Sequence, residues 1–363
     1  MNDLIPIDYY TTFYFQFFLI VVAMTVLHCF VLEINENKNV LYINFIGYIS
    51  FLFTVLYMGL RPIHDVFVDM TMYAHTFERF KENNPVKIYG DYGFFNFLEA
   101  SAKVMSAENF FFICAVLYVF PIYYISKKWF KEYWFYSFLV LVISFSFWAY
   151  GTNGIRNGLA TSFFLFALAF KDRKIVLFAI MFLACTFHKT MLLPSLAYLL
   201  VLLHNNPNTY LKVWFFSILL SLVFGGLFVE LFANIGFEDA RVDLYFTDEI
   251  DESLTKTGFR WDFLLYSATG VYAGWYYIIK KNFDDTFYIR LFNIYLIANA
   301  FWVLVIRANF SNRFAYLSWF MLGVIIIYPL LKQNFLSNQH RVIGGVLIIY
   351  FAFTYLMNVI LVK

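Results

Sequence analysis

Long apolar blocks alternate with short polar connections along almost the whole chain. Each block approaches the roughly 20 helical residues that are needed to cross a hydrocarbon layer about 30 Å thick. The blocks are continuously apolar and show no alternation of the kind found in barrel strands, which favours helices. The pattern therefore predicts an all-α polytopic membrane protein in which residues 1–363 form a single integral membrane domain.

About twelve transmembrane helices are expected. They lie near residues 12–32, 40–60, 108–126, 133–150, 154–170, 174–188, 190–204, 211–235, 260–279, 287–306, 313–331 and 341–362. Two connections are long. Residues 61–107 contain two short amphipathic segments, FVDMTMYAHTFERF and YGFFNFLEASAKVM, which predict helices that lie at the membrane interface. Residues 236–259 are acidic and predict a flexible polar loop.

The basic residues of the short connections predict the orientation. KKWFK at 127–131, KDRK at 171–174 and KK at 280–281 fall in alternate connections and so on one side. Short cationic connections stay on the cytoplasmic side. Both long connections are therefore expected on the external side.

Composition agrees with a membrane protein and excludes other classes. Hydrophobic residues make up 62% and charged residues 14% of the chain, whereas soluble domains have about 45–50% and about 25%. The net charge of +2 excludes the clustered basic face of a nucleic-acid-binding protein. The lipid bilayer is thus an expected partner, and nucleic acid is not.

The arginines are distributed differently from the lysines. Only Arg173 and Arg341 fall on the expected cytoplasmic side, although topology signals alone would place most arginines there as they do most lysines. Seven of the ten arginines are expected outside, namely Arg61, Arg79, Arg156, Arg241, Arg260, Arg307 and Arg313. Because a guanidinium matches phosphate oxygens better than an ammonium does, this bias indicates an external anion site.

The densest candidate region is YGTNGIRNGLATSFF followed by LACTFHKTMLLP. Helices from Arg173 to Arg156 and from Lys174 to His188 measure about 26 and 21 Å, less than the thickness of the hydrocarbon layer. Arg156 and His188 are therefore expected below the external surface, facing a protein cavity. The alternative is that both snorkel from helix ends. The glycines beside Arg156 fit either an anion-binding helix start or close helix packing.

Other candidate residues lie on either side of this region. Arg307 and Arg313 bracket a turn between adjacent spans and, with Arg156, could hold a diphosphate; the alternative is interfacial anchoring. Asp69 and Tyr73 are one helical turn apart, and a carboxylate there could activate a hydroxyl or bind a sugar. Zinc-ligand spacing, a catalytic triad and a phosphate-binding glycine loop are absent from the sequence, which predicts neither a metal nor a cofactor.

Several motifs together resemble the EpsG-like family of Wzy-type polysaccharide polymerases. They are GIRNGLATSFFLFALAF, TFHKTMLLP and NRFAYLSWFMLGVIIIYP, together with an upstream Arg61, Asp69, Tyr73, Phe77 element and an Asp91, Gly93, Phe94 element. Three positions depart from the family pattern. Asn157 stands where Gln is usual, Met70 where Tyr is common, and Lys189-Thr190 where a small residue and Ser often follow the histidine.

The resemblance implies a GT-C-like glycosyltransferase of the bacterial inner membrane with its active site facing the periplasm. Its substrates would be undecaprenyl-diphosphate-linked glycans, and it would use no metal or other cofactor. By the same resemblance, Arg156, Arg313, Arg307 and Arg61 would bind the diphosphate. Tyr73 and Asn157 would also contact substrate. His188 would be the base or a second phosphate contact, and Asp69 is a competing candidate for the base. A chain-length regulator protein remains open as a partner.

Three alternatives remain open at this stage. A lipid-linked glycan flippase would have pseudo-symmetric halves and would need no recessed histidine. An O-antigen-ligase-like transferase would share the arginines and differ in its acceptor. A membrane acyltransferase would need a thioester site on the cytoplasmic side.

Overall fold

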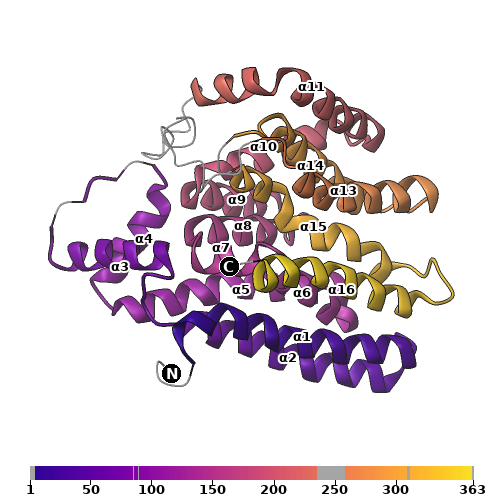
Figure 1. Ribbon diagram of the computed structural model, residues 1–363, viewed down its shortest axis with the longest axis horizontal. Coiled ribbons are helices and arrows are strands. Elements are labelled where there is room, and N and C mark those ends of the chain that lie inside the picture. The colour runs from indigo at the N-terminus through magenta and orange to yellow at the C-terminus, as the bar shows by residue number, and fades with distance from the viewer. Residues whose placement is uncertain (1–4, 85, 89, 235–257, 309–310, 362–363) are drawn as a thin grey trace. The chain divides into compact units, whose positions relative to one another are not determined.

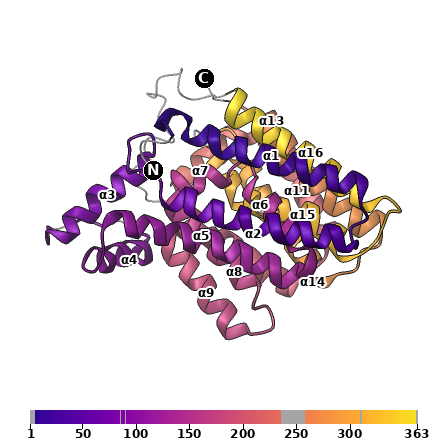
Figure 2. The ribbon, with the colours of Figure 1, turned by 90° about the horizontal axis from the view of Figure 1, so that it is seen from below.

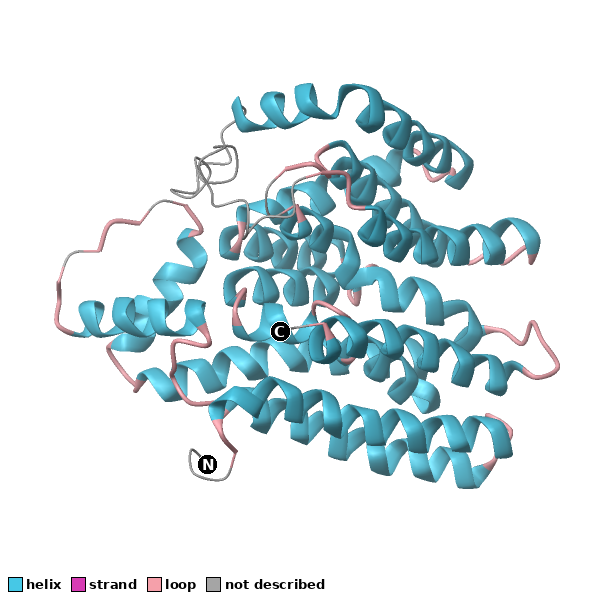
Figure 3. Cartoon of the chain, viewed as in Figure 1, coloured by secondary structure: helices cyan, strands magenta, loops and turns pink. Residues whose placement is uncertain are grey.

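The computed structural model describes residues 5–84, 86–88, 90–234, 258–308 and 311–361. Within these residues every regular element is a helix (Figures 1 and 3), which confirms the all-α class. The acidic connection expected at 236–259 lies outside the described residues, except for its last two positions.

Among the described residues, seven helical segments are long and apolar enough to cross a membrane. They are Ile7–Val31, Asn37–Gly59, Ala107–Val142, Pro207–Phe228, Thr286–Leu304, Asn312–Lys332 and Gln339–Ile360. The protein is therefore a multi-pass membrane protein. The expected number of twelve spans is not confirmed.

Three of the remaining expected spans are present as shorter helices. They are α8 (Ile155–Leu168) and α9 (Lys174–Phe187), each of 14 residues, and α10 (Leu192–Leu203) of 12 residues. A helix of 14 residues rises about 21 Å, which is less than the roughly 30 Å of a hydrocarbon layer. These helices alone do not reach from one face of a bilayer to the other.

The other two expected spans are interrupted. The apolar run at 133–150 forms two helices, α6 (Trp134–Val142) and α7 (Phe147–Thr152), with a non-helical break between them. The run at 260–279 forms α13 (Trp261–Trp275), which continues into a π-helical turn at Tyr276–Lys280. Hydropathy measures how apolar a run is but does not show where its backbone departs from an α-helix. The sequence therefore predicted neither the break after α6 nor the π-helical turn after α13.

The chain divides into two compact units, Met1–His188 with Leu330–Lys363, and Lys189–Pro329. The further helices of the first unit are α1 (Tyr10–Val31), α2 (Asn37–Gly59), α3 (Val68–Lys81), α4 (Tyr92–Ala102), α5 (Ala107–Phe130) and α16 (Gln339–Tyr355). Besides α10 and α13, the second unit contains α11 (Pro207–Asn234), α14 (Thr286–Leu304) and most of α15 (Asn312–Lys332).

In the first unit α1 packs along α16, and α2 packs along α5 (Figures 1 and 2). Two tyrosines join the start of α1 to the end of α2. The rings of Tyr10 and Tyr57 stack 4.3 Å apart, and each hydroxyl donates a hydrogen bond to the backbone carbonyl of the other residue. This exchange fixes the end of α2, from which the chain leads into the candidate site.

The two amphipathic segments of the first long connection form α3 and α4, as expected. Their apolar stripes face other helices of the unit, because α3 packs on α4 and α5, and α4 packs on α5 and α9. On α3 the buried side chains are Met70, Tyr73 and Phe77, which share one helix face. Their position at a membrane interface stays a prediction.

Candidate functional site

Arg156 lies in the first turn of α8 and is largely enclosed by protein. Its Nη1 donates a hydrogen bond of 2.7 Å to Oδ2 of Asp91, and the two side chains are 16% and 7% exposed. The guanidinium carbon is also 5.8 Å from the ring centre of Tyr73 and 5.6 Å from that of Phe95. The guanidinium therefore has a carboxylate and two aromatic rings around it, an arrangement that fixes its orientation.

Glycines allow α7 and α8 to pack closely beside Arg156. A Cβ at Gly158 would lie 2.4 Å from the backbone oxygen of Tyr150, whereas heavy atoms in contact need about 3.5–4.0 Å. Gly151 faces α2 instead, and a Cβ there would lie 2.5 Å from Cε at the flexible end of Met58. Close packing thus explains Gly158, and the anion-binding helix start stays a prediction.

Asp91 is placed by a tight left-handed turn. It has a φ of +50° and follows Gly90, whose φ is +79°. Asp91 precedes the first turn of α4 and its backbone carbonyl accepts from the amides of Phe94 and Phe95, but its carboxylate makes no capping hydrogen bond to that helix. The carboxylate is directed to Arg156 instead. In the sequence Asp91 belongs to a family motif, but nothing local indicates its partner 65 residues away.

His188 ends α9 next to the start of α4. A Cβ at Gly93 would lie 2.3 Å from Oγ1 of Thr186, so the two helices are in close contact there. Phe187 packs its ring against Phe94 of α4, with ring centres 6.2 Å apart. His188 follows directly as the half-buried C-terminal cap of α9. The structure therefore places His188 at the α9 end that packs on the helix carrying Asp91.

Tyr73 and Asp69 both lie on α3. Tyr73 is 1% exposed, and its ring lies 4.9 Å from that of Phe94 in addition to its contact with Arg156. Asp69 lies one turn earlier in the helix and is half-buried. The sequence predicted that these two side chains share a helix face, and Tyr73 reaches the guanidinium of Arg156 from that helix.

Arg61 is the most deeply buried arginine of the predicted set, at 4% exposure. Its Nη1 donates to the carbonyl of Met58, and its guanidinium lies 5.7 Å from the ring centre of Phe67. Its Nε and Nη2 have no hydrogen-bond partner among the residues that the structure describes. Burial lowers the pKa of Arg61 from 12.5 to about 10, so the group remains a cation at neutral pH.

Asn157 has a similar unmet hydrogen-bonding capacity. The residue is 8% exposed, and within the described part of the chain its Oδ1 accepts no hydrogen bond. Buried polar atoms are nearly always paired with protein or ordered water. The donors of Arg61 can therefore bind water or an oxygen of the substrate, and the acceptor of Asn157 can bind water or a substrate hydroxyl.

The EpsG family matches residues 44–363, a segment that includes every residue predicted for the site. The chain belongs to the EpsG family. This family is one of exopolysaccharide and Wzy-type polymerase-like proteins. None of the curated proteins or solved structures compared with this EpsG family member matches it.

The two remaining arginines of this EpsG family member belong to its second unit. Arg307 follows α14 and Arg313 lies in the first turn of α15, so they bracket the connection as expected. Both are exposed. Nη2 of Arg307 donates to the carbonyl of Leu222 at 3.4 Å, and its Cδ would lie 2.8 Å from a Cβ at Gly225. That glycine lets the arginine lie against α11.

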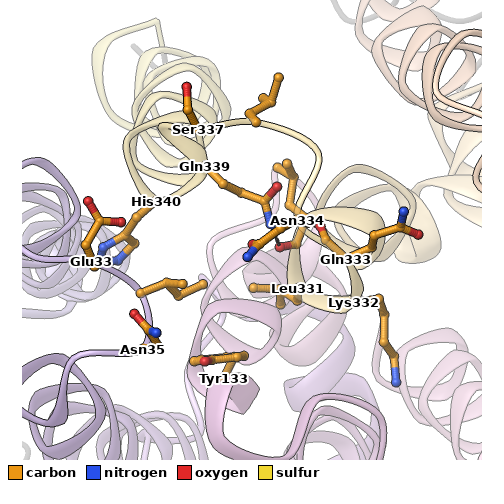
Figure 4. A pocket seen from close by; sticks show the side chains of 13 residues that line it. Glu33, Asn35, Tyr133, Leu331, Lys332, Gln333, Asn334, Ser337, Gln339 and His340 are labelled. Carbon is orange, nitrogen blue, oxygen red and sulfur yellow. Dashed lines mark hydrogen bonds between the residues drawn. The ribbon is translucent and has the colours of Figure 1, made fainter.

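Figure 4 shows a separate polar pocket of the first unit, at the end of α2 remote from Arg61. Its volume is about 440 Å³. Gln339 holds the backbone on one side of the pocket in place. Its Nε2 donates to the carbonyls of Leu330 and Gln333, and its Oε1 accepts from the amide of Phe335. Of the described residues that line the pocket, none belongs to the predicted site. Nor does the described part of the chain hold a group of three or more His, Cys, Asp or Glu suited to a metal ion.

Proposed function

We propose that this protein is a membrane glycosyltransferase that polymerises lipid-diphosphate-linked oligosaccharide repeat units into surface polysaccharide. Membership of the EpsG family supports this class of activity. The observation that carries the proposal is the Arg156 guanidinium, which is enclosed by protein and held by Asp91 between the rings of Tyr73 and Phe95. A preorganised cation in a site of low water content stabilises charge that develops on a leaving group.

The reaction transfers a glycan from one lipid to another. The bond between the anomeric carbon and the phosphate oxygen of the donor breaks, and the lipid diphosphate leaves with the bonding electron pair. The oxygen of an acceptor hydroxyl forms the new glycosidic bond and gives its proton to a base. Negative charge therefore grows on the diphosphate, and this is the charge that Arg156 would stabilise.

Further residues take roles around this step. Arg61 would provide a second contact to anionic oxygen, because two of its nitrogens are buried without a partner among the described residues. His188 or Asp69 would be the base, since an imidazole or a carboxylate can accept the hydroxyl proton. Tyr73 and Asn157 would contact the glycan.

Arg313 and Arg307 would bind diphosphate oxygens. Arginine forks can chelate phosphate oxygens; Arg307 lies on the connection between α14 and α15, and Arg313 lies in the first turn of α15. In this proposal the lipid is undecaprenyl diphosphate, and the architecture is GT-C-like. The protein lies in the bacterial inner membrane with the site facing the periplasm. The orientation is supported by the basic residues of the alternate short connections.

Incubation of the purified protein with lipid-linked repeat units tests the proposal. A ladder of lipid-linked oligomers is expected without added nucleotide or metal. A flippase would move the substrate across vesicles without lengthening it, and a ligase-like transferase would form a product only when a different acceptor is added. Either of these results would overturn the assignment as a polymerase.

A further inference from the structure

Asp91 occupies a position whose backbone conformation favours glycine. At a φ of +50° most side chains are strained, aspartate and asparagine less than others, whereas glycine adopts this conformation at no steric cost. The carboxylate also forgoes the capping hydrogen bond that an aspartate at the start of a helix usually makes. The carboxylate accepts the 2.7 Å hydrogen bond from Arg156 instead.

We infer that Asp91 is a positioning residue that holds Arg156 in the reactive orientation and competes with the anionic substrate for its charge. This inference rests on the proposed function where it names the lipid diphosphate as the substrate. With Nη1 bonded to Asp91, the orientation of the guanidinium plane is set before substrate arrives. The rings of Tyr73 and Phe95 limit its rotation further.

The carboxylate has two opposite effects on the reaction. A phosphate that binds the same guanidinium lies within a few ångströms of Asp91, and two anions at that distance repel each other. Asp91 therefore weakens binding of the diphosphate. A fixed guanidinium, however, needs no reorganisation as charge develops in the transition state, so Asp91 also raises turnover.

Asp91→Asn separates the charge from the geometry. Asparagine tolerates the left-handed conformation and keeps an oxygen that can accept from Nη1, so the substitution removes chiefly the negative charge. We expect it to tighten binding of inorganic pyrophosphate to the purified protein by about tenfold, and to lower both KM and kcat for lipid-linked repeat units. Asp91→Gly relieves the backbone and removes the acceptor as well. It should give the same tighter binding with a larger loss of kcat.

The chain supplies a matched control for this experiment. Asp262 also accepts a 2.7 Å hydrogen bond from an arginine, Arg260, but its side chain is 48% exposed. Asp262→Asn should leave pyrophosphate binding and the kinetic constants unchanged. Arg156→Gln should abolish the tightening when it is combined with Asp91→Asn.

The outcomes distinguish this inference from the proposed function. Unchanged pyrophosphate affinity and kcat in Asp91→Asn and Asp91→Gly, with only a loss of thermal stability, would show that the pair is structural and would overturn the inference. If the wild-type protein forms no glycan oligomers but Asp91→Asn still binds pyrophosphate more tightly, the proposed polymerase function is wrong. The competition of Asp91 with the anion would still hold. If oligomers form and the Asp91 variants behave as wild type, the function stands alone.

Discussion

Arg61 gives a prediction in which stability and activity change in opposite directions. Folding buries its guanidinium and leaves Nε and Nη2 without partners in the described part of the structure. A pKa lowered from 12.5 to about 10 means that folding disfavours the charged form at every pH below about 10. At about 1.4 kcal/mol for each pKa unit, the buried charge costs the folded state about 3 kcal/mol.

Arg61→Met removes this charge and keeps an unbranched side chain of similar reach. The substitution also loses the hydrogen bond from Nη1 to the carbonyl of Met58, which costs about 1 kcal/mol. The net effect should be a stabilisation of about 2 kcal/mol. If Arg61 binds an anionic oxygen of the substrate, the same variant should lose about 10²-fold or more in turnover.

Two measurements on one preparation test this prediction. Thermal unfolding of the detergent-purified protein reports stability, and elongation of lipid-linked repeat units reports activity. Arg173→Met, which changes an exposed arginine at the start of α9, serves as the control and should alter neither quantity. A less stable Arg61→Met variant with wild-type turnover would contradict this prediction. It would show that the charge of Arg61 stabilises the folded protein and does not bind substrate.

Two further predictions concern the residues around Arg156. Arg156→Ala and His188→Ala should each abolish long glycan chains in cells and reduce turnover by about 10²–10³-fold. Each variant protein should still accumulate in the membrane. Wild-type chain-length ladders from both variants would contradict the assignment of the site. Gly158→Ala places a methyl group 2.4 Å from the carbonyl oxygen of Tyr150 and should lower both thermal stability and activity. Gly345→Ala, inside α16 at a position with open space around it, should lower neither, because alanine favours a helix. Equal behaviour of the two glycine variants in a melting assay would argue against the close packing of α7 on α8.

Local patterns in the sequence predicted the parts of the structure that depend on local forces. The amphipathic periods of 67–80 and 92–105 correctly predicted α3 and α4, because an apolar stripe at helical spacing has to face other helices or a membrane. Arg156 was expected below the membrane surface, where polar groups usually face protein. Its side chain is 16% exposed, and its depth in the membrane stays a prediction.

Long-range pairings and backbone breaks could not be predicted in this way. The contact between Arg156 and Asp91 joins positions 65 residues apart, and neither position carries a local sign of the other. The break between α6 and α7 contains Ser144 and Ser146, but the run stays apolar overall, so hydropathy alone does not mark the break. Arg61 is buried beside the ring of Phe67 in the connection from α2 to α3, where no periodic pattern marks which side chains are buried.

The central claim is that glycan is transferred from a lipid diphosphate, and the most direct test is the stoichiometry of the released lipid. Purified protein is incubated with lipid-linked repeat units, and free lipid diphosphate and new glycosidic bonds are quantified in the same reaction. The account predicts one lipid diphosphate released for each bond formed, and neither product with Arg156→Ala. Translocation of intact lipid-linked units without release of lipid diphosphate would contradict it.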